Sequence, residues 1–114
     1  MWLRKIDAII RPDRLNAVKE ALVQIGVKGM TVSEVFGCGL QKGHTSVYRG
    51  QEYKINLLPK VKIEIVIPAG MVQDVVTVIK EQAYSGKIGD GKIFIYPVEN
   101  VYRIRTDESG IAAL

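Results

Sequence analysis

Apolar and polar residues alternate at every second position in several short stretches of this chain. The clearest stretch runs from Val61 to Ile67, where β-branched residues alternate with lysine and glutamate. Similar alternation covers residues 5–10 and 30–35, and it returns at 93–98 and briefly at 101–105. A period of two places successive side chains on opposite faces of a strand. The pattern therefore predicts four half-buried β-strands and a short fifth strand near the end.

Two other stretches repeat apolar residues at intervals of three and four, as one face of an α-helix does. The first begins at Pro12 and Asp13, which suit the first turn of a helix, and ends at Gly26 and Gly29. Its expected core face consists of Leu15, Val18, Leu22 and Ile25. The second helix has an expected core face of Val72, Val75, Val76, Ile79 and Ala83. Two amphipathic helices are predicted.

The order of these elements is strand, helix, strand, long loop, strand, helix, strand. That order is the α+β ferredoxin-like βαββαβ plan, with both helices on one face of an antiparallel sheet. We expect a single domain over residues 1–114, because this length suits one modest core. The other sheet face needs a cover, so we expect an oligomer. The fold alone decides no function.

The alternation disappears after Gly37 for about twenty residues, a length that is uncommon for a structureless loop unless it is functional or disordered. We expect a flexible loop at about 38–58. Gln41 and Lys60 stand at its two ends, where a Lys ammonium and a Gln carbonyl suit a small dicarboxylate with a metal. Alternatively, Gly37 and Gly39 only release the chain from the sheet and Lys60 is an exposed charge.

A glycine-rich segment, expected to form a loop over about 84–92, joins the second helix to its following strand. Gly89 and Gly91 flank Asp90 and precede Lys92. Closely spaced glycines let backbone N–H groups converge on an anion, and a neighbouring lysine adds a charge for a phosphate. The alternative is an ordinary tight turn. The segment lacks the spacing of a P-loop.

Arg103 and Arg105 are separated by one residue, which would place both guanidinium groups on one face of the short final strand. Two planar forks on one face suit a polyphosphate. The alternative is a solvated edge strand whose charges prevent edge-to-edge pairing.

Composition narrows the class of protein. Hydrophobic residues make up 47% and charged residues 25%, as in ordinary globular domains, and the net charge is +4. That charge favours an anionic ligand but is too small to indicate a nucleic-acid surface. The single cysteine, Cys38, rules out an internal disulfide, and no apolar run approaches the roughly 18 residues of a membrane span. No apolar signal segment stands at the start, so we expect a cytoplasmic location.

The sequence disfavours two other functions. A small enzyme is disfavoured because no nucleophile stands beside the only histidine, His44, and no carboxylate pair is clustered, so no catalytic residues are assigned. An RNA-binding module of similar fold needs alternating aromatic residues on its central strands. Phe94 and Tyr96 alternate in this way, but the other expected central strand offers only aliphatic residues. No direct nucleic-acid binding is expected.

Several longer motifs together indicate a protein family. They are Gln41–Thr45 (QKGHT), Tyr48–Gly50 with Glu52 and Tyr53, Leu58–Glu64 (LPKVKIE) and Gly86–Phe94 (GKIGDGKIF). Nearer the ends stand Ile9–Pro12 (IIRP), Gly29–Val32 (GMTV) and Arg103–Thr106 (RIRT). Together these motifs resemble the PII nitrogen-signalling proteins nearly end to end, and the stretch Gly37–Gln41 resembles members from Gram-positive bacteria.

The resemblance implies a non-catalytic homotrimer with ATP or ADP bound competitively in the clefts between subunits. By similarity, the nucleotide-binding residues are Gly29, Thr31, Gly37, Glu64, Gly89, Asp90, Gly91, Lys92, Arg103 and Arg105, the two arginines reaching across from the adjacent subunit. With Mg²⁺ and ATP in place, Gln41 and Lys60 match the residues that hold 2-oxoglutarate, Gln41 near the metal. Leu40 stands where many relatives have an arginine that contacts the ATP phosphates.

The resemblance also implies how the signal is passed on. Ordering of the loop root around Mg²⁺, ATP and 2-oxoglutarate would release partners, whereas the ADP form would leave the loop free to bind them. Arg49 matches the arginine that blocks an ammonium channel, and Tyr53 matches a tyrosine that some lineages uridylylate. Gln51 replaces a serine that some relatives phosphorylate. The implied partners are an ammonium transporter at the inner membrane face and nitrogen-metabolism enzymes or a transcription regulator.

Overall fold

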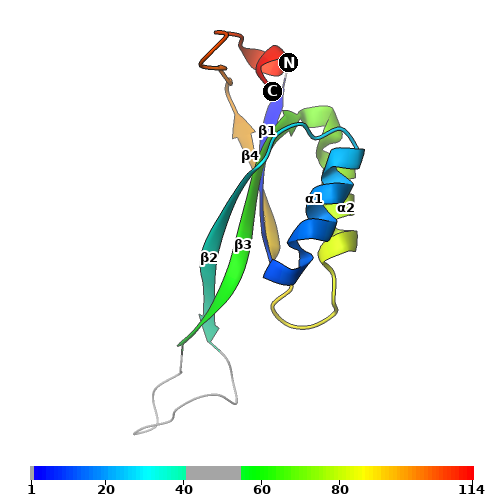
Figure 1. The fold of residues 1–114 in the computed structure, drawn as a ribbon, viewed down its shortest axis with the longest axis vertical. Coiled ribbons are helices and arrows are strands. Elements are labelled where there is room, and N and C mark those ends of the chain that lie inside the picture. Colours follow the sequence, from blue (N-terminus) through cyan, green and yellow to red (C-terminus); the bar gives the residue numbers. More distant parts are fainter. Residues whose placement is uncertain (1, 41–54) are drawn as a thin grey trace, which may run out of the picture.

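The computed structural model describes residues 2–40 and 55–114, and the fold is shown in Figure 1. The strands are β1 (Leu3–Ile10), β2 (Thr31–Leu40), β3 (Ile55–Pro68) and β4 (Lys92–Val98). The helices are α1 (Leu15–Gln24) and α2 (Val72–Ala83), each preceded by one short 3-10 turn, at Pro12–Arg14 and Ala69–Met71. A last 3-10 turn spans Gly110–Ala113.

The four strands form one antiparallel sheet in the order β2-β3-β1-β4, and both helices lie on one of its faces (Figure 1). The two central strands, β1 and β3, come from different halves of the chain. This arrangement confirms the predicted α+β ferredoxin-like fold.

The core lies between the helices and the helix-facing side of the two central strands. The buried strand residues are Ile6, Ala8 and Ile10 of β1 and Val61, Ile63, Ile65 and Ile67 of β3. Val18 and Leu22 of α1 and Val75, Ile79 and Ala83 of α2 pack against them. These are the residues that the periods of two and of three to four predicted, because burial on one face is what imposes such periods.

The opposite side of the sheet, which we call the open face, is covered by no element among the described residues. The register places Asp7 of β1 between Glu64 of β3 and Phe94 of β4, and Lys5 beside Tyr96. The rings of Phe94 and Tyr96 are 44% and 43% exposed. An antiparallel sheet often leaves one face to solvent or to a partner.

The two strands on either side of the predicted loop, β2 and β3, run further than the sequence pattern indicates. β2 continues to Leu40 and β3 begins at Ile55, so a two-stranded ribbon replaces the ends of the loop expected at about 38–58. Residues 55–60 of β3 pair only with β2, since the pairing of β1 stops at Val61. Phe36 and Leu57 of the ribbon are exposed. A ribbon without a buried face imposes no apolar period, which is why the pattern ended early.

The predicted short strand at 101–105 is wrong. Tyr102 makes one isolated bridge with Ser109, and residues 104–106 form a turn closed by hydrogen bonds from Arg103 N to Glu108 O (2.8 Å) and from Asp107 N to Arg103 O (2.8 Å). The segment pairs with its own continuation instead of the sheet. Ile104 is fully exposed, so the alternation there reflected no buried face.

Gly91 is the position where the backbone tolerates no side chain. Its φ is +105°, and a Cβ placed there would lie 1.7 Å from the carbonyl oxygen of Ile9. We expect Gly91→Ala to lower the free energy of unfolding by roughly 2 kcal/mol or more, because β1 and the glycine-rich loop would have to separate.

Denaturant unfolding at one fixed protein concentration measures this effect. Gly70→Ala is the matched control, because nothing lies within 4 Å of a Cβ at that position, and it should change stability by less than about 0.5 kcal/mol. Equal stability of the two variants would contradict the close approach.

Candidate functional site

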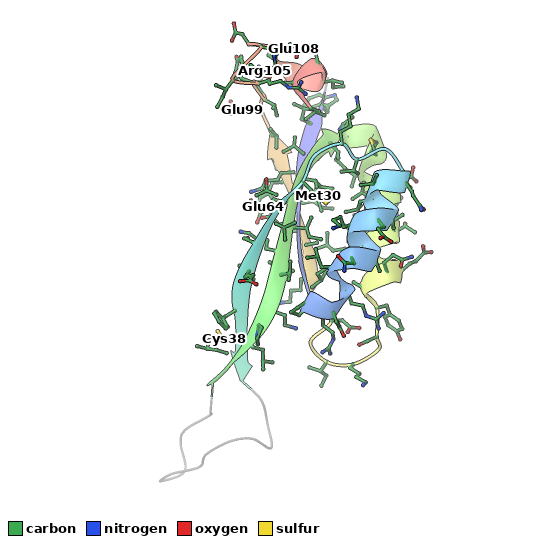
Figure 2. All side chains as sticks on the ribbon, in the orientation of Figure 1. Met30, Cys38, Glu64, Glu99, Arg105 and Glu108 are labelled. Carbon is green, nitrogen blue, oxygen red and sulfur yellow. The ribbon has the colours of Figure 1, made fainter. Side chains whose placement is uncertain are left out.

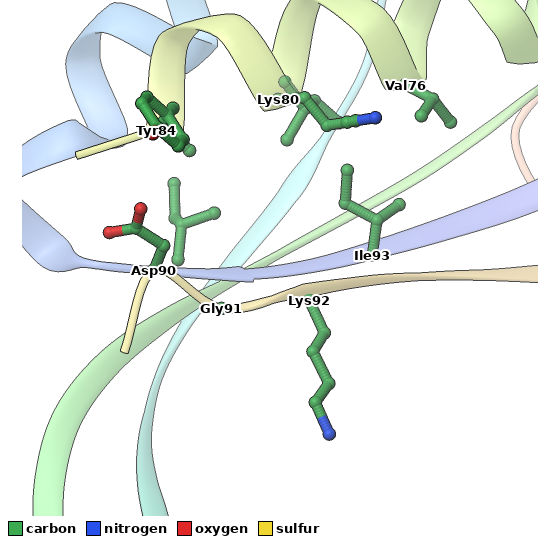
Figure 3. A pocket seen from close by; sticks show the side chains of 10 residues that line it. Val76, Lys80, Tyr84, Asp90, Gly91, Lys92 and Ile93 are labelled. Carbon is green, nitrogen blue, oxygen red and sulfur yellow. The ribbon is translucent and has the colours of Figure 1, made fainter. Parts of the chain in front are cut away.

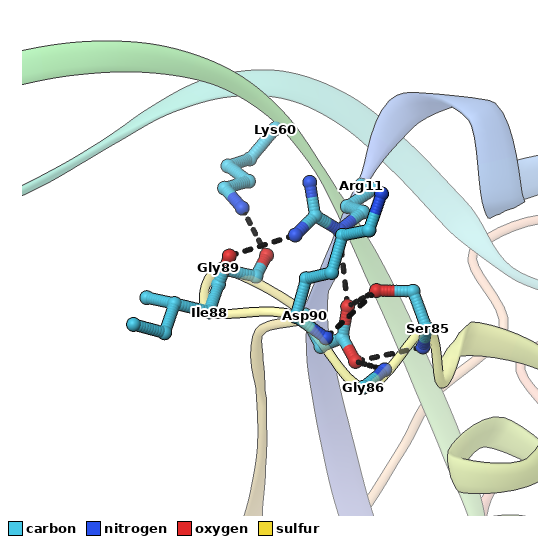
Figure 4. A network of polar contacts seen from close by, with 8 residues as sticks. Arg11, Lys60, Ser85, Gly86, Ile88, Gly89 and Asp90 are labelled. Carbon is cyan, nitrogen blue, oxygen red and sulfur yellow. Dashed lines mark hydrogen bonds and ion pairs between the residues drawn. The ribbon is translucent and has the colours of Figure 1, made fainter.

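The glycine-rich loop between α2 and β4 is organised around the carboxylate of Asp90 (Figure 4). Oδ2 accepts hydrogen bonds from the backbone N–H groups of Ser85 (2.7 Å) and Gly86 (2.9 Å). Oδ1 accepts from the Ser85 hydroxyl and from Nε of Arg11 (3.0 Å). The carboxylate therefore closes the loop on itself and ties it to the end of β1.

These contacts fix the charge of Asp90. The Ser85 hydroxyl, then the Ser85 backbone N–H, and to a smaller extent Arg11 hold the pKa of the Asp90 carboxyl well below its usual range. Asp90 was predicted to bind nucleotide. The structure turns its side chain toward the loop interior, where it shapes the loop and leaves Gly89 partly exposed.

Two cationic side chains converge on Gly89. Nζ of Lys60 donates to the Gly89 carbonyl oxygen, and Nη2 of Arg11 donates to the carbonyl oxygen of Ile88 (2.7 Å). A Cβ at Gly89 would lie 3.3 Å from each of these nitrogens. The glycine thus sits against an ammonium and a guanidinium group, as Figure 4 shows.

Lys60 also connects this loop to the root of the β2–β3 ribbon. A Cβ at Gly37 would lie 3.2 Å from Cγ of Lys60, so the lysine stem crosses directly over that glycine. Gly37, Lys60 and Gly89 were predicted from three separate segments. The structure brings these three residues into one cluster.

A second group of predicted residues lies further along the open face. Gly29, Thr31 and Glu64 line a hollow of about 640 Å³, and Thr31 is the cross-strand partner of Glu64. Lys5 Nζ is 2.8 Å from Glu64 Oε1, and this hydrogen bond is the main cause that lowers the pKa of the Glu64 carboxyl. Figure 2 labels Glu64 at mid-sheet and Cys38 toward the far end of the ribbon.

Lys92 belongs to the same open face. It pairs with Ile9 of β1, which pairs with Lys62 of β3 on its other side. In Figure 3, the side chain of Lys92 points away from α2. A mostly apolar cavity of about 360 Å³ lies beneath that helix, and its lining includes Lys80 and Ile93 as well as Asp90, Gly91 and Lys92.

Arg103 and Arg105 lie at the other end of the subunit. They stand near the chain termini, beyond β4, while the glycine-rich loop lies at the opposite end of β4 (Figures 1 and 2). Nη2 of Arg103 donates to the carbonyl oxygen of Leu114 (2.8 Å), and Arg105 is exposed. One copy of the chain does not bring these arginines to Lys92.

Gln41, Arg49 and Tyr53 lie outside the described residues, so their predicted roles stay predictions. Arg11, by contrast, is a site residue that the residue-by-residue reasoning missed. The sequence order could have indicated it. Arg11 directly follows β1, and the glycine-rich loop directly precedes β4, so both lie at the same end of this antiparallel pair.

The described residues contain no group of three or more His, Cys, Asp or Glu side chains that suits a metal. Within the same ranges, no helix is long and apolar enough to cross a membrane. The central strands carry Lys5, Asp7, Lys62 and Glu64 on the open face, and the aromatic pair lies on edge strand β4. Carboxylates at the sheet centre disfavour an RNA backbone, so the RNA-binding alternative loses its support.

Comparison with known proteins decides the family. The family model described as Nitrogen regulatory protein P-II matches residues 3–108. The chain is 56% identical over 112 residues to Nitrogen regulatory protein P-II 1 of Escherichia coli (strain K12), covering 98% of this chain and 100% of that protein. The chain belongs to the P-II family. It is a nitrogen regulatory signalling protein and not an enzyme, as predicted.

Solved structures of P-II proteins share the fold. The structure of the B. subtilis GlnK-ATP complex has a TM-score of 0.88 and 42% identity, covering 99% of this chain and 98% of that one. The structure of Arabidopsis thaliana PII bound to citrate has a TM-score of 0.80 and 40% identity, covering 99% and 92%.

Because Asp90 has a lowered pKa in the folded chain, its contacts add stability above the ordinary Asp pKa of about 3.9, and this stability is lost as pH falls toward the folded value. We expect Asp90→Asn to lower the thermal midpoint at pH 7, with a deficit relative to wild type that shrinks below about pH 4. Thermal scans at pH 7, 5 and 3 measure it. Asp74→Asn, an exposed position on α2, is the control. A deficit independent of pH would contradict the assignment.

Proposed function

We propose that this P-II protein senses adenine nucleotide and 2-oxoglutarate as a homotrimer, and reports them to nitrogen-metabolism partners through the segment between β2 and β3. The observation that carries the proposal is the position of Lys60, which lies against Gly37 at the root of that segment and against Gly89 in the glycine-rich loop. A ligand that engages Lys60 therefore acts on both at once.

The open face has the length and charge that suit ATP or ADP. Glu64 and Lys60 point to this face from β3, four residues apart, which corresponds to about 13 Å along a strand. Lys62 of β3 and Lys92 of β4 stand in the row between them. The face thus has a carboxylate at one end and cations at the other. The nucleoside would lie beside Thr31 and Glu64, and the phosphates would lie toward Lys92.

The glycine-rich loop adds backbone donors to these cations. No hydrogen bond from the N–H of Ile88 or Gly89 is formed to other atoms of the described residues. Positive φ at Gly89 and Gly91 gives this stretch the backbone conformation from which anion-binding concavities are built. This supports a phosphate-binding role for Gly89 and Gly91, with Asp90 holding the loop in shape.

The arginines indicate that the site is shared between copies. Arg103 and Arg105 lie at the far end of the subunit from Lys92, so they reach such a site only from a neighbouring chain. A heterologous contact repeated around a closed ring places one such site at each interface. The exposed open face of a small basic domain is consistent with a homotrimer that buries part of it.

For 2-oxoglutarate, Lys60 would hold a carboxylate, with Arg11 beside it as a second cation. Mg²⁺ would be held by ATP phosphates, by 2-oxoglutarate and by Gln41, which lies outside the described residues; the described residues themselves offer no metal cage. Two relatives support an anion site: the B. subtilis GlnK-ATP complex and the Arabidopsis thaliana protein bound to citrate, a small polycarboxylate.

The signal to partner proteins would arise from competition between the Gly89 carbonyl and 2-oxoglutarate for Lys60. Its ammonium group donates to the Gly89 carbonyl, and a carboxylate of 2-oxoglutarate would draw it away and reorder the root at Gly37. In the ADP form the segment would be free for partners, with Arg49 as the residue inserted into an ammonium transporter at the inner membrane face. Tyr53 remains a candidate modification site. The protein would otherwise act in the cytoplasm on enzymes or a transcription regulator.

Calorimetry with lysine-to-methionine variants separates the two ligands, because methionine keeps the aliphatic stem and removes the charge. Lys92→Met should weaken ATP binding by about 10- to 100-fold, the loss of one charge-assisted hydrogen bond. Lys60→Met should weaken 2-oxoglutarate binding in Mg²⁺ and ATP by a similar factor and ATP binding much less. Lys19→Met, exposed on α1, is the control. Equal losses of both ligands in both variants would refute two adjoining sites, as would 2-oxoglutarate binding without nucleotide.

A mixing experiment tests whether the site is shared. A chain with Lys92→Met and a chain with Arg103→Met and Arg105→Met should each bind ATP weakly as pure trimers. In randomly mixed trimers about one quarter of the sites should regain wild-type affinity, because each such site takes its loop from one copy and its arginines from the next. Quantitative ATP titration of refolded mixtures measures this fraction. No recovery would place both groups in one chain's site.

A further inference from the structure

Asp7, in the middle of central strand β1, is the one buried charged residue among those that the structure describes, with 5% of its surface exposed. It points to the open face, between Glu64 on β3 and Phe94 on β4. Neither the glycine-rich loop nor Lys60 contacts it. It is therefore a charged group that the proposed nucleotide site leaves unused.

The carboxylate of Asp7 lacks a full set of partners in the isolated chain. Its Oδ1 accepts no hydrogen bond from any described residue. Lys5 Nζ lies 3.4 Å from that oxygen, but the same ammonium is 2.8 Å from Oε1 of Glu64. The hydrogen bond to Glu64 is also the main cause that raises the pKa of Lys5. One ammonium thus faces two carboxylates, with the shorter contact to Glu64.

Such an arrangement is unfavourable by itself. Like charges directly opposite on paired strands repel, and a buried carboxylate without donors keeps the cost of losing its water. Buried charges are therefore normally paired. Lys5, Asp7 and Glu64 carry one positive and two negative charges, Lys62 acts on Glu64 as well, and Asp7 Oδ1 is left without a hydrogen-bond donor among the described residues.

We infer that a second copy of this chain supplies that group. In the homotrimer of the proposed function, on which this inference rests, a lysine or arginine of the neighbouring subunit donates to Asp7 Oδ1, and the open face around it is the subunit interface.

The surroundings of the cluster favour a second copy over other occupants. Phe94 stands beside Asp7 in the sheet, and the ring of Tyr96 lies 5.6 Å from the ammonium of Lys5, so partly exposed aromatic rings border the charges. Aromatic residues are enriched at protein interfaces relative to the rest of the surface. The chain has 16 basic against 12 acidic residues, so a second copy offers surplus cations. A phosphate-bearing ligand would instead bring negative charge toward two carboxylates.

Asp7→Leu should change the stability of the single chain and the stability of the trimer in opposite directions. Asp7→Leu removes an unsatisfied buried oxygen, so the isolated chain should be at least as resistant to unfolding as wild type. The same change leaves the neighbour's cation buried without its partner, so the trimer should dissociate at least tenfold more readily. If the Asp7 carboxylate has no role in assembly, Asp7→Leu will not make the trimer dissociate more readily.

Sedimentation velocity over a dilution series, and subunit exchange between isotopically labelled and unlabelled trimers followed by native mass spectrometry, measure the second effect. Circular dichroism checks the fold. Asp7→Asn keeps the shape and one acceptor oxygen and should weaken assembly less than Asp7→Leu. Glu20→Gln, which makes the same change in net charge on exposed α1, should have no effect on assembly.

Three outcomes overturn the inference. If wild type is a trimer and Asp7→Leu assembles equally well or better, Asp7 is no interface anchor, while the proposed trimer and its nucleotide sites stand. If Asp7→Leu leaves assembly unchanged but weakens ATP binding, the carboxylate serves the ligand instead. A wild-type chain that stays monomeric at all concentrations would refute the trimer and this inference together.

Discussion

The central place of β1, paired on one side with β3 and on the other with β4, is the constraint on which the rest of the structure depends. Its helix-facing residues supply the middle of the core, and its C-terminal end carries Arg11 and the Ile9 carbonyl that meets Gly91. The glycine-rich loop, the root of the β2–β3 ribbon and the cations between them are all placed by that pairing. If β1 shifted its register by one residue, its buried and exposed side chains would exchange faces and the cluster would be lost.

The contacts at this end of the sheet divide into those that shape the loop and those that can be exchanged. The Asp90 carboxylate is satisfied from within, by Ser85, Gly86 and Arg11, and four contacts of this kind are costly to replace together. The bonds from Lys60 and Arg11 to backbone carbonyls are single donor contacts at a partly exposed surface. Such contacts are readily given up for an anion, because a carboxylate or phosphate is a stronger acceptor than a neutral carbonyl.

Sequence reasoning succeeded where burial imposes a period. The core faces of β1, β3, α1 and α2 were predicted because each packs one side against the others. It failed where neither face is buried, in the ribbon from Phe36 to Leu40 and at residues 101–105. For the site, the residue types of Lys60, Lys92 and Glu64 suggested anion chemistry. No local pattern encodes the contacts between distant segments. These contacts bring Lys60 to Gly89, turn Asp90 inward and add Arg11 to the cluster.

The ribbon formed by the far ends of β2 and β3 has a mechanical consequence. From Lys60 to Ile55 it pairs with no third strand, and its apolar residues Phe36 and Leu57 are exposed among the described residues. A ribbon attached in this way can act as a lever whose fulcrum lies at Lys60 and Gly37, where β3 leaves the four-stranded sheet. A rotation of about 10° there would move the end of the described ribbon, roughly 17 Å away at the usual strand rise, by about 3 Å. A displacement of one side chain at the fulcrum can thus be read by a partner as a change of position at a distance.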